Sequence, residues 1–409
     1  MQVYLVGGAV RDKLLGHEVQ ERDWVVVGAT SEQMIQQGYQ QVGKDFPVFL
    51  HPTTKEEYAL ARTERKSGKG YSGFTCYAAP DVTLQQDLLR RDLTINAMAQ
   101  DDAGNIIDPF GGQRDLQHKI LRHVSPAFTE DPLRILRLAR FYARYAPLGF
   151  TIAEETQALL LAMVRAGEVS ALVPDRVWQE IEKVLGEAQP QLFFDVLRRC
   201  GALAILFPEL DNLFGVPNPV YWHPEIDSGV HTMMALTQAA RLTENKQVRF
   251  AVLVHDLGKA VTAQKDWPSH PDHGPKGVPL IRQLAQRYPI PRQYQELAIL
   301  VSNHHIACHK SQQLKPEELL TFLENLDVFR RPERFQQFLL ACEADFRGRT
   351  GNEHEIYQQS AHLCAIYKVI AAVKAQDFIA QGIAGSAIAQ ALRQHRLALI
   401  TDYMERLHH

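Results

Sequence analysis

A glycine pair and two nearby carboxylates at the start of the chain have the composition of a site that handles a nucleoside triphosphate. The apolar run 3–6 leads directly into Gly7-Gly8, and Arg11 follows. Glycines after a strand let backbone N–H groups approach a phosphate closely, and an arginine can bond that phosphate bidentately. Glu21 and Asp23 stand two apart at the start of the next apolar run, so both point to one face of a strand.

These two carboxylates can serve as metal ligands. Mg²⁺ prefers carboxylate oxygens, and such ions bridge the oxygens of a bound triphosphate. A glycine turn or an acidic pair on its own is more often only a turn or a solvated strand edge. Their succession within the first 27 residues is much rarer and predicts a nucleotidyl-transfer site that uses Mg²⁺.

An arginine pair in the segment Arg90-Arg91-Asp92-Leu93-Thr94-Ile95-Asn96-Ala97 is a second candidate. If Asp87 or Asp92 begins a helix, Arg91 lies near a helix N-terminus, where phosphate oxygens are favoured. The alternative is an arginine pair that only forms ion pairs with Asp87 or Asp92. The residues alone leave both interpretations open.

Regularly spaced arginines after Asp131-Pro132 form a third candidate. Proline suits a first helical turn, and Asp131 can cap that helix. At about 100° per residue, the arginines then fall within one stripe of about 120°. They are Arg134, Arg137, Arg140 and Arg144. Most such stripes are simply the basic surface of an amphipathic helix.

The start of this stripe suggests a more specific function. Cytosine and adenine each present an amino donor beside a ring-nitrogen acceptor, whereas guanine and uracil present the reverse order. An aspartate acceptor beside an arginine donor matches the first two bases and opposes the others. Asp131 and Arg134 are three apart and are therefore neighbours on a helix. The pair predicts selection of C and A without a template, with each mismatched buried group costing about 1–3 kcal/mol.

Histidines and aspartates in the second half of the chain form a candidate metal centre. His231 precedes the segment His255-Asp256-Leu257-Gly258-Lys259. Further candidates are His270, His273, His304, His305 and Asp345. Imidazoles with a shared carboxylate suit a metal that keeps open positions and activates water against a phosphate ester. Because 17 histidines make chance pairs common, the residues alone leave the ligand set open.

The elements that must position these groups change character near residue 125. Before that point we expect strands over 3–6, 24–27, 48–50, 58–62 and 105–108, with a mobile glycine-rich loop at Arg65–Gly73. From Thr129 onward the periodicity is helical, and we expect no strong strand. The predicted helices cover 154–165, 175–185, 192–206, 231–242, 249–257, 295–305, 316–326, 332–345 and 355–374.

The predicted fold class is an α/β nucleotidyltransferase head followed by all-α domains. We expect the head over 1–125 and a helical neck over 126–225. The histidine-bearing domain should cover 226–330 and a helical tail 331–409. Segment 215–219 is expected to be a linker, and 267–278 a break between helices.

Composition excludes several classes of protein. No apolar run approaches the roughly 18–20 residues that span a membrane, and no basic segment precedes the first apolar residues as in a signal peptide. Five scattered cysteines without a Cys-x-x-Cys favour a reduced cytoplasmic compartment. With a net charge of −3, any RNA contact must use local basic faces. The sequence leaves monomer and homodimer open.

The head motifs stand in the order found in class II tRNA nucleotidyltransferases. They are Gly-Gly-x-Val-Arg-Asp, the acidic pair, Arg-Arg-Asp-Leu-Thr-Ile-Asn-Ala, Asp-Pro-Phe-Gly-Gly and Glu-Asp-x-x-Arg-x-x-Arg, within residues 1–145. The chain resembles bacterial CCA-adding enzymes that carry an appended HD domain. The resemblance implies a polymerase-beta-like nucleotidyltransferase head and a nucleotide-selecting, RNA-binding neck over 126–225. That family usually has Asp-x-Asp as its acidic pair. Here the first member is Glu21, whose extra methylene shifts the ligand geometry.

The resemblance implies a role for each matching position. Gly8 and Arg11 would contact the triphosphate, while Glu21 and Asp23 would hold the catalytic Mg²⁺ ions. The nucleotide pocket would be lined by Arg91, Arg137 and Arg140, with Asp131 and Arg134 reading the base. The tRNA 3′-hydroxyl would attack the α-phosphate of CTP or ATP and release pyrophosphate. The segment Arg65–Gly73 matches the family's flexible loop, which matters for switching from C to A.

His-Asp-Leu-Gly-Lys with an upstream histidine resembles the HD phosphohydrolases. The resemblance implies that His231, His255, Asp256 and His305 hold a transition metal such as Ni²⁺, with Asp345 as a further candidate. His255 and Asp256 would be catalytic in hydrolysing phosphate monoesters and diesters, including 2′,3′-cyclic phosphates and 2′-nucleotides. One chain could then clean a damaged tRNA 3′ end and rebuild it.

Three alternatives stay open at this point. A bacterial poly(A) polymerase shares the head motifs, although the HD motif, the near-neutral charge and the absence of a basic tail argue against it. A tRNA-binding module with an inactive transferase site would retain only hydrolysis. A working transferase with a purely structural HD fold would retain only nucleotide addition.

Overall fold

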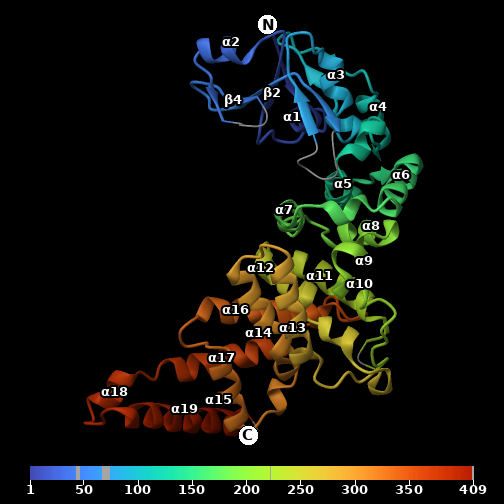
Figure 1. Cartoon of the computed structure of the whole chain (residues 1–409). Coiled ribbons are helices and arrows are strands. Elements are labelled where there is room, and N and C mark those ends of the chain that lie inside the picture. Colours follow the sequence, from blue (N-terminus) through green and yellow to red (C-terminus); the bar gives the residue numbers. More distant parts are fainter. Residues whose placement is uncertain (43–46, 67–73, 222, 408–409) are drawn as a thin grey trace. The chain divides into compact units, whose positions relative to one another are not determined.

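The computed structural model describes residues 1–42, 47–66, 74–221 and 223–407 (Figure 1). The chain divides into two compact units between Leu206 and Phe207. Strands and helices alternate at the start of the first unit, and the second unit is helical in its described part. The predicted α/β head followed by helical domains is confirmed. The finer boundaries within each unit remain predictions.

The head is built on a mixed sheet of seven described strands in the order β3-β4-β5-β2-β1-β8-β9. Its strands are β1 (Gln2–Val6), β2 (Asp23–Val27), β3 (Gln40–Gln41), β4 (Val48–Leu50), β5 (Glu57–Leu60), β8 (Ala99–Gln100) and β9 (Ile106–Ile107). β1 and β2 are antiparallel, and β2 runs parallel to β5. The five strands expected from the sequence are confirmed, apart from one or two terminal residues.

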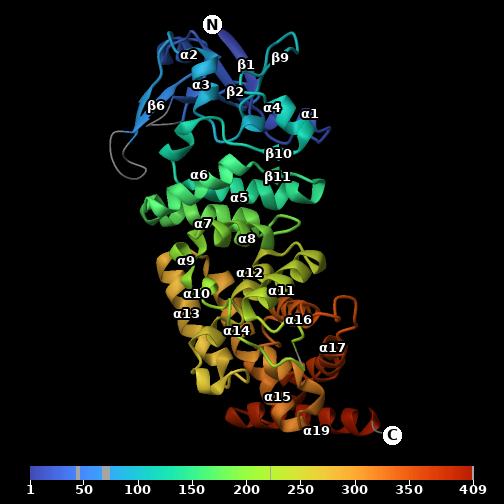
Figure 2. The ribbon, with the colours of Figure 1, turned by 90° about the vertical axis from the view of Figure 1, so that its right-hand side faces the viewer.

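Both faces of this sheet are covered. On β2, Val25 packs in one apolar cluster with Leu88, while its neighbour Val26 packs in the other with Met34. Alternate residues of a strand point to opposite faces, so the two clusters lie on opposite sides of the sheet. The helices of the head are α1 (Gly8–Leu14), α2 (Ser31–Gln36), α3 (Leu84–Leu89) and α4 (Gly112–His118) (Figure 2).

A hairpin of β6 (Thr63–Lys66) and β7 (Phe74–Tyr77) stands apart from the main sheet. Part of the loop expected at Arg65–Gly73 is therefore strand, because Arg65 and Lys66 pair with Thr75 and Phe74. Residues 67–73 of that expectation lie outside the described residues.

Helices complete the first unit. They are α5 (Leu133–Tyr145), α6 (Glu154–Arg165), α7 (Pro174–Val184), α8 (Gln191–Cys200) and α9 (Ala202–Leu206). The helix expected over 192–206 is broken at Gly201, whose φ of 82° ends α8. Two-residue strands β10 (Ile120–Leu121) and β11 (Thr151–Ile152) pair in parallel. β11 is a short exception to the expectation of no strong strand in this part of the chain.

The second unit is a helical domain that departs from expectation in two segments, 267–278 and 215–219. Its described helices are α10 (Pro208–Asp211), α11 (Ser228–Leu242), α12 (Lys246–Val254), α13 (His273–Arg287), α14 (Arg292–His309), α15 (Pro316–Asn325), α16 (Pro332–Arg347), α17 (Gln358–Ala371), α18 (Ala375–Ile379) and α19 (Ser386–Leu407). The break expected over 267–278 is wrong in its second half, because α13 begins at His273 despite its glycines and Pro279. α19 lies within the helical tail expected over 331–409, although the sequence analysis gave it no bounds of its own.

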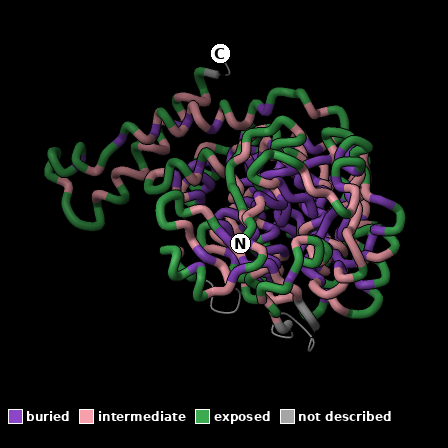
Figure 3. Tube along the Cα trace, turned by 90° about the horizontal axis from the view of Figure 1, so that it is seen from above, coloured by how far each residue is buried: buried purple, intermediate pink, exposed green. Residues whose placement is uncertain are grey.

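Segment 215–219 is not a linker but part of this packed unit. Asn218 is 1% exposed and accepts a hydrogen bond from the Ser228 hydroxyl at 2.9 Å, and the Pro217 carbonyl bonds His270 Nε2 at 2.7 Å. The turn residues of this segment mark a folded loop. By contrast, the C-terminal helices α18 and α19 contain few buried residues (Figure 3). Within the described residues, no helix has the length and apolar character to cross a membrane.

Candidate active sites

The sheet register brings the Asp23 carboxylate next to the glycine turn. Val6, the last residue of β1, pairs with Asp23, the first residue of β2. Gly7 follows Val6 directly with φ 69° and ψ −130°, a conformation that favours glycine. A Cβ on Gly7 would lie 2.9 Å from Arg91 Nη1, so an arginine guanidinium lies against the turn. Turn, carboxylate and cation thus meet at one edge of the sheet.

Glu21 and Asp23 are both exposed at this edge. Partial desolvation of Asp23 raises its pKa; Arg91 opposes this shift and the neighbouring Glu21 carboxylate adds to it. A divalent cation would relieve the repulsion between the two acids. These residues therefore fit the Mg²⁺ site that the sequence predicts.

Arg91 reaches the site from the C-terminal end of a helix. α3 spans Leu84–Leu89, so Asp87 lies inside it and neither Asp87 nor Asp92 begins an α-helix. The placement of Arg91 at a helix N-terminus was therefore wrong. Asp87 is buried and accepts from Arg90 Nη2 at 2.6 Å and Arg91 Nη2 at 3.2 Å. Burial alone would raise the pKa of Asp87, but the two guanidinium groups lower it. Both arginines thus pair with Asp87, and Arg91 Nη1 also lies against the Gly7 turn, so the ion pairs do not exclude a role at the nucleotide.

Arg11 is the buried centre of a polar network. Its Nε and Nη2 bond both oxygens of Asp12 at 2.9 and 3.0 Å, and its Nη1 bonds Asn96 Oδ1 at 2.5 Å. Asn96 in turn donates to Asp92 at 2.9 Å, and Asp92 accepts from Arg137 Nε at 2.9 Å. Arg11 and Arg137, both expected at the nucleotide, thus also join α1 to α5.

The arginine stripe of α5 faces protein partners along its length. Arg134 donates to the backbone carbonyls of Ala127 and Arg90 at 2.6 and 2.5 Å. Further along, Arg140 bonds Glu180 and Arg144 bonds Glu187, each with a shortest distance of 2.7 Å. Arg134 and Arg140 are both 7% exposed. The stripe is therefore packed at Arg134 and Arg140, whereas Arg137 is half-buried and Arg144 is exposed.

Asp131 lies at the start of α5 with a partner that the sequence analysis did not anticipate. Its Oδ1 accepts from the Leu133 N–H at 3.1 Å, which satisfies one free donor of the first helical turn. Its Oδ2 accepts from Arg176 Nη2 of α7 at 2.7 Å. Arg176 and Glu180 stand four apart on α7, and this helical spacing was the available signal that both face α5.

In the second unit, three helices and the short turn after α12 bring histidines and aspartates into a buried cluster. His231 comes from α11, His255 and Asp256 follow α12, His305 comes from α14 and Asp345 from α16. His231 Nε2 lies 2.9 Å from Asp345 Oδ1, and His255 Nε2 lies 3.2 Å from Asp256 Oδ2. His305 Nε2 lies 3.6 Å from Asp256 Oδ1. All five predicted residues therefore converge.

His273 of α13 joins the same cluster, and a glycine makes its approach possible. His273 Nε2 lies 3.3 Å from Asp256 Oδ1 and 3.1 Å from His305 Nε2. A Cβ on Gly258 would lie 1.8 Å from the His273 carbonyl oxygen. Only glycine at position 258 lets α13 pack this closely on the His-Asp segment.

Backbone carbonyls orient several of these rings. His255 Nδ1 lies 2.7 Å from the Val252 carbonyl, and His273 Nδ1 lies 2.9 Å from that of His270. His305 Nδ1 lies 3.0 Å from the Val301 carbonyl. A proton on Nδ1 leaves Nε2 with a lone pair, and in each ring Nε2 is the atom that faces the cluster.

This cluster fits a metal ion by its chemistry. Several groups of three or more donors each have their ligand atoms within 4.8 Å of one another. His255 Nε2 and Asp256 Oδ1 are buried without a well-aligned hydrogen-bond partner among the described residues. Burial favours the protonated acids, yet nearby histidines and Lys259 hold the pKa of Asp256 well below its usual value. Mixed imidazole and carboxylate ligands suit a transition metal, and a hydrolytic site needs such an ion with open positions.

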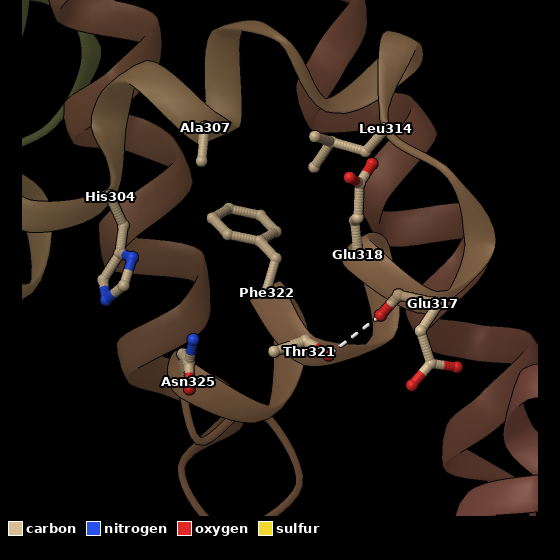
Figure 4. A pocket seen from close by; sticks show the side chains of 8 residues that line it. All are labelled: His304, Ala307, Leu314, Glu317, Glu318, Thr321, Phe322 and Asn325. Atoms are coloured by element: carbon tan, nitrogen blue, oxygen red, sulfur yellow. Dashed lines mark hydrogen bonds between the residues drawn. The ribbon is translucent and has the colours of Figure 1, made fainter.

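Two histidines near the motif lie elsewhere. His270 bonds the Thr262 hydroxyl at 2.6 Å and the Pro217 carbonyl, so it holds the loop. His304 lines a pocket between α14 and α15 together with Phe322 and Asn325 (Figure 4). Sequence reasoning missed Glu225, whose Oε1 lies 2.9 Å from His231 Nδ1, and His309, which bonds Asp345 at 2.6 Å. His309 stands four residues after His305 on the same helix, which was a usable signal.

Comparison with known families defines the class of protein. Residues 3–122 match the Poly A polymerase head domain, and residues 149–214 match the probable RNA and SrmB-binding site of polymerase A. Residues 229–329 match the HD domain. The chain is thus a nucleotidyltransferase head joined to an RNA-binding region and an HD domain.

The particular family follows from a relative and from solved structures. The chain is 60% identical over 397 residues to the Multifunctional CCA protein of Thioalkalivibrio sulfidiphilus, covering 97% of each chain. It belongs to the multifunctional CCA protein family. The Thermotoga maritima CCA-adding enzyme complexed with tRNA has the same fold, with a TM-score of 0.65 at 20% identity over 99% of this chain and 91% of that one. The Bacillus stearothermophilus enzyme with CTP gives 0.64 at 22% over 98% and 89%.

Proposed function

We propose that the first unit adds C, C and A to the 3′ end of tRNA from CTP and ATP without a template. The observation that carries this proposal is the meeting of Asp23, the Gly7 turn and Arg91 at one sheet edge. Mg²⁺ held there by Glu21 and Asp23 would polarise the attacking hydroxyl and steady the leaving pyrophosphate. Gly8 and Arg91 would bind the triphosphate, because exposed backbone N–H groups and a guanidinium both favour phosphate oxygens.

In this proposal, residues where the head meets α5 select the nucleotide. Asp131 and Arg134 would read the base. Arg137 and Arg140 would line the nucleotide pocket, and Arg11 would contact the triphosphate. Arg176 pairs with Asp131 through both oxygens, so it fixes the direction in which the acceptor points. A fixed acceptor rejects a mismatched base because the buried group would lose its partner.

Labelled nucleotides supplied singly and in pairs test this activity. A tRNA transcript without CCA, with Mg²⁺ and both CTP and ATP, should gain three nucleotides and no more. GTP and UTP should give no addition. A long ladder with ATP alone would identify a poly(A) polymerase instead, and no addition would leave an RNA-binding protein with only the HD chemistry.

We propose a second activity for the HD domain, the hydrolysis of phosphate monoesters and diesters such as a 2′,3′-cyclic phosphate. His231, His255, Asp256, His305 and Asp345 would hold a transition metal such as Ni²⁺, which would supply an activated water. Lys259 Nζ lies 2.7 Å from Asp256, and Arg349 Nη2 lies 3.9 Å from Asp345. Among the described residues Arg349 Nε is buried without a hydrogen-bond partner, so we infer that its guanidinium can take a substrate phosphate.

Cyclic-phosphate hydrolysis with and without added Ni²⁺, Co²⁺ or Mg²⁺ tests this second activity. His255→Ala and Asp256→Ala should lose hydrolysis and keep nucleotide addition. If both variants hydrolyse like the wild type, the HD fold is structural. The substrate of both reactions would be tRNA, so we place the protein in the cytoplasm; the five cysteines, all free in the structure, agree with a reducing compartment.

A further inference from the structure

Asp345 is held on its two oxygens by different side chains. Oδ1 lies 2.9 Å from His231 Nε2 and 3.6 Å from His255 Nε2, inside the metal-ligating cluster. Oδ2 lies 2.6 Å from Nε2 of His309, the last residue of α14. His309 belongs to none of the donor groups that could share an ion. One oxygen of the carboxylate therefore faces the cluster, and the other faces His309.

Tyr357 completes this arrangement on the far side of the imidazole. Its hydroxyl lies 2.9 Å from His309 Nδ1 and 3.4 Å from Cys308 Sγ, and the residue is 3% exposed. A neutral imidazole has one N–H and one lone pair, and a phenol has one proton to donate. When Tyr357 donates to Nδ1, the imidazole proton is on Nε2 and points at Asp345. The chain Tyr357, His309, Asp345 then has one donor for each acceptor.

We propose that His309 is a positioning residue for the HD metal site and that Tyr357 fixes the tautomer in which His309 donates to Asp345. The hydrogen bond at Oδ2 sets the plane of the carboxylate, so that Oδ1 faces His231 and His255. This inference rests on the proposed metal-dependent hydrolysis, because it concerns how the same site is held. Outer partners of this kind change metal affinity by about 10–100-fold when they are removed.

Ni²⁺ affinity of the full-length protein, measured by calorimetry in excess Mg²⁺, tests the proposal. The Mg²⁺ keeps the head site occupied, and the absorption spectrum of the Co²⁺-loaded protein gives a second readout of ligand geometry. His309→Ala is expected to weaken Ni²⁺ binding by about 10–100-fold and to change the Co²⁺ spectrum. His309→Gln should restore most of the affinity, because its amide nitrogen can take the place of Nε2 and donate to Asp345.

Tyr357→Phe should weaken Ni²⁺ binding by less than the about 10–100-fold expected for His309→Ala, because the ring is kept and only the donor to Nδ1 is removed. His304→Ala is the matched control, since His304 lies on the same helix but faces the pocket beside Phe322 (Figure 4). It should bind Ni²⁺ like the wild type. Circular dichroism melting and nucleotide addition by the head verify that each variant is folded.

Two results would overturn the proposal. One is a folded His309→Ala protein that binds Ni²⁺ within about twofold of the wild type, far from the loss expected for an outer partner. The other is a His309→Gln protein as weak as His309→Ala, since the donor would then not be what matters. His255→Ala distinguishes failure of the positioning role from failure of the metal site itself. If His255→Ala binds Ni²⁺ like the wild type, the metal site itself is absent and the proposed hydrolysis fails with it.

Discussion

Asp23 has two charged neighbours that shift its pKa in opposite directions. Arg91 stabilises the carboxylate, whereas partial desolvation and Glu21 destabilise it. Arg91 also lies against Gly7, where a triphosphate would approach. The residue types at this edge of the sheet were predictable from sequence. The ion pair that holds Arg91 against the site was not predictable. The sequence did not show whether Arg91 precedes or follows the helix that contains Asp87.

Asp23→Ala should therefore lose nucleotide addition. Stabilisation of the transferred phosphate by the metal contributes several kcal/mol, and each 1.4 kcal/mol is a factor of about ten, so we expect a loss of roughly 1000-fold or more. Initial rates of labelled CMP incorporation into a tRNA transcript measure it. Glu57→Ala, on the neighbouring strand at the position paired with Asp23, is a control for a lost surface charge. Equal loss in both variants would contradict a specific role for Asp23.

His255 carries a pH-dependent prediction for metal binding. Burial alone would lower its pKa, but Asp256 and Asp345 raise it to about 10. The metal-free protein then holds a proton on His255 throughout the neutral range, and a metal ion must displace it. Apparent Ni²⁺ affinity in excess Mg²⁺ should rise with pH below that value, by about tenfold per pH unit if one proton is released. Calorimetry at about pH 6.5, 7.5 and 8.5 would show this rise in Ni²⁺ affinity. An affinity independent of pH would contradict it.

The geometry of the HD metal site depends on how closely α13 packs against the His-Asp segment, as well as on the ligands themselves. α13 and the His-Asp segment meet at Gly258, and the helix was hidden from sequence analysis by its glycines and Pro279. Its position nevertheless brings His273 into the cluster. Strongly amphipathic helices such as α5 and α7 were predictable, since apolar residues recur along one face of each. The folding of segment 215–219 into the domain depends on Asn218 and Pro217 contacts made across the chain, which no local pattern encodes.

Gly258→Ala tests this view of the element packing. The added Cβ would overlap the His273 carbonyl, so α13 must move, and overpacking of this kind costs about 1–3 kcal/mol. We expect a lower melting temperature for the HD domain, weaker Ni²⁺ binding and loss of cyclic-phosphate hydrolysis. Nucleotide addition should be kept. Unchanged Ni²⁺ affinity in a folded variant would contradict the role given to this contact.

At the scale of the whole molecule, the two candidate sites lie in different compact units, divided between Leu206 and Phe207. The order of the head motifs and the His-Asp segment was sufficient to predict two chemistries on one chain. It did not place the division between the units, because helical periodicity continues on both sides of residue 206. Each unit holds its own ligands, so each site should take up metal independently of the other.

Selective stabilisation by metal follows from this separation. A ligand that binds only the folded state at 100 times its Kd adds about 2.7 kcal/mol to stability. In excess Mg²⁺, Ni²⁺ at that level should raise the thermal transition that reports the unit 207–409 in the wild type. Differential scanning calorimetry of His255→Ala should show no such rise, whereas Asp23→Ala should behave like the wild type. A Ni²⁺ effect that depends on Asp23 would contradict the assignment of separate sites.

To test whether one chain both repairs and extends a tRNA 3′ end, one damaged tRNA is followed through both reactions. The substrate is a tRNA transcript that lacks CCA and ends in a 2′,3′-cyclic phosphate, incubated with Mg²⁺, Ni²⁺, CTP and ATP. The wild type should open the cyclic phosphate, remove the phosphate and then add three nucleotides. Asp23→Ala should stop at the repaired end, and His255→Ala should leave the cyclic phosphate intact. Addition by His255→Ala to the blocked end, or no repair by any form of the protein, would contradict the account.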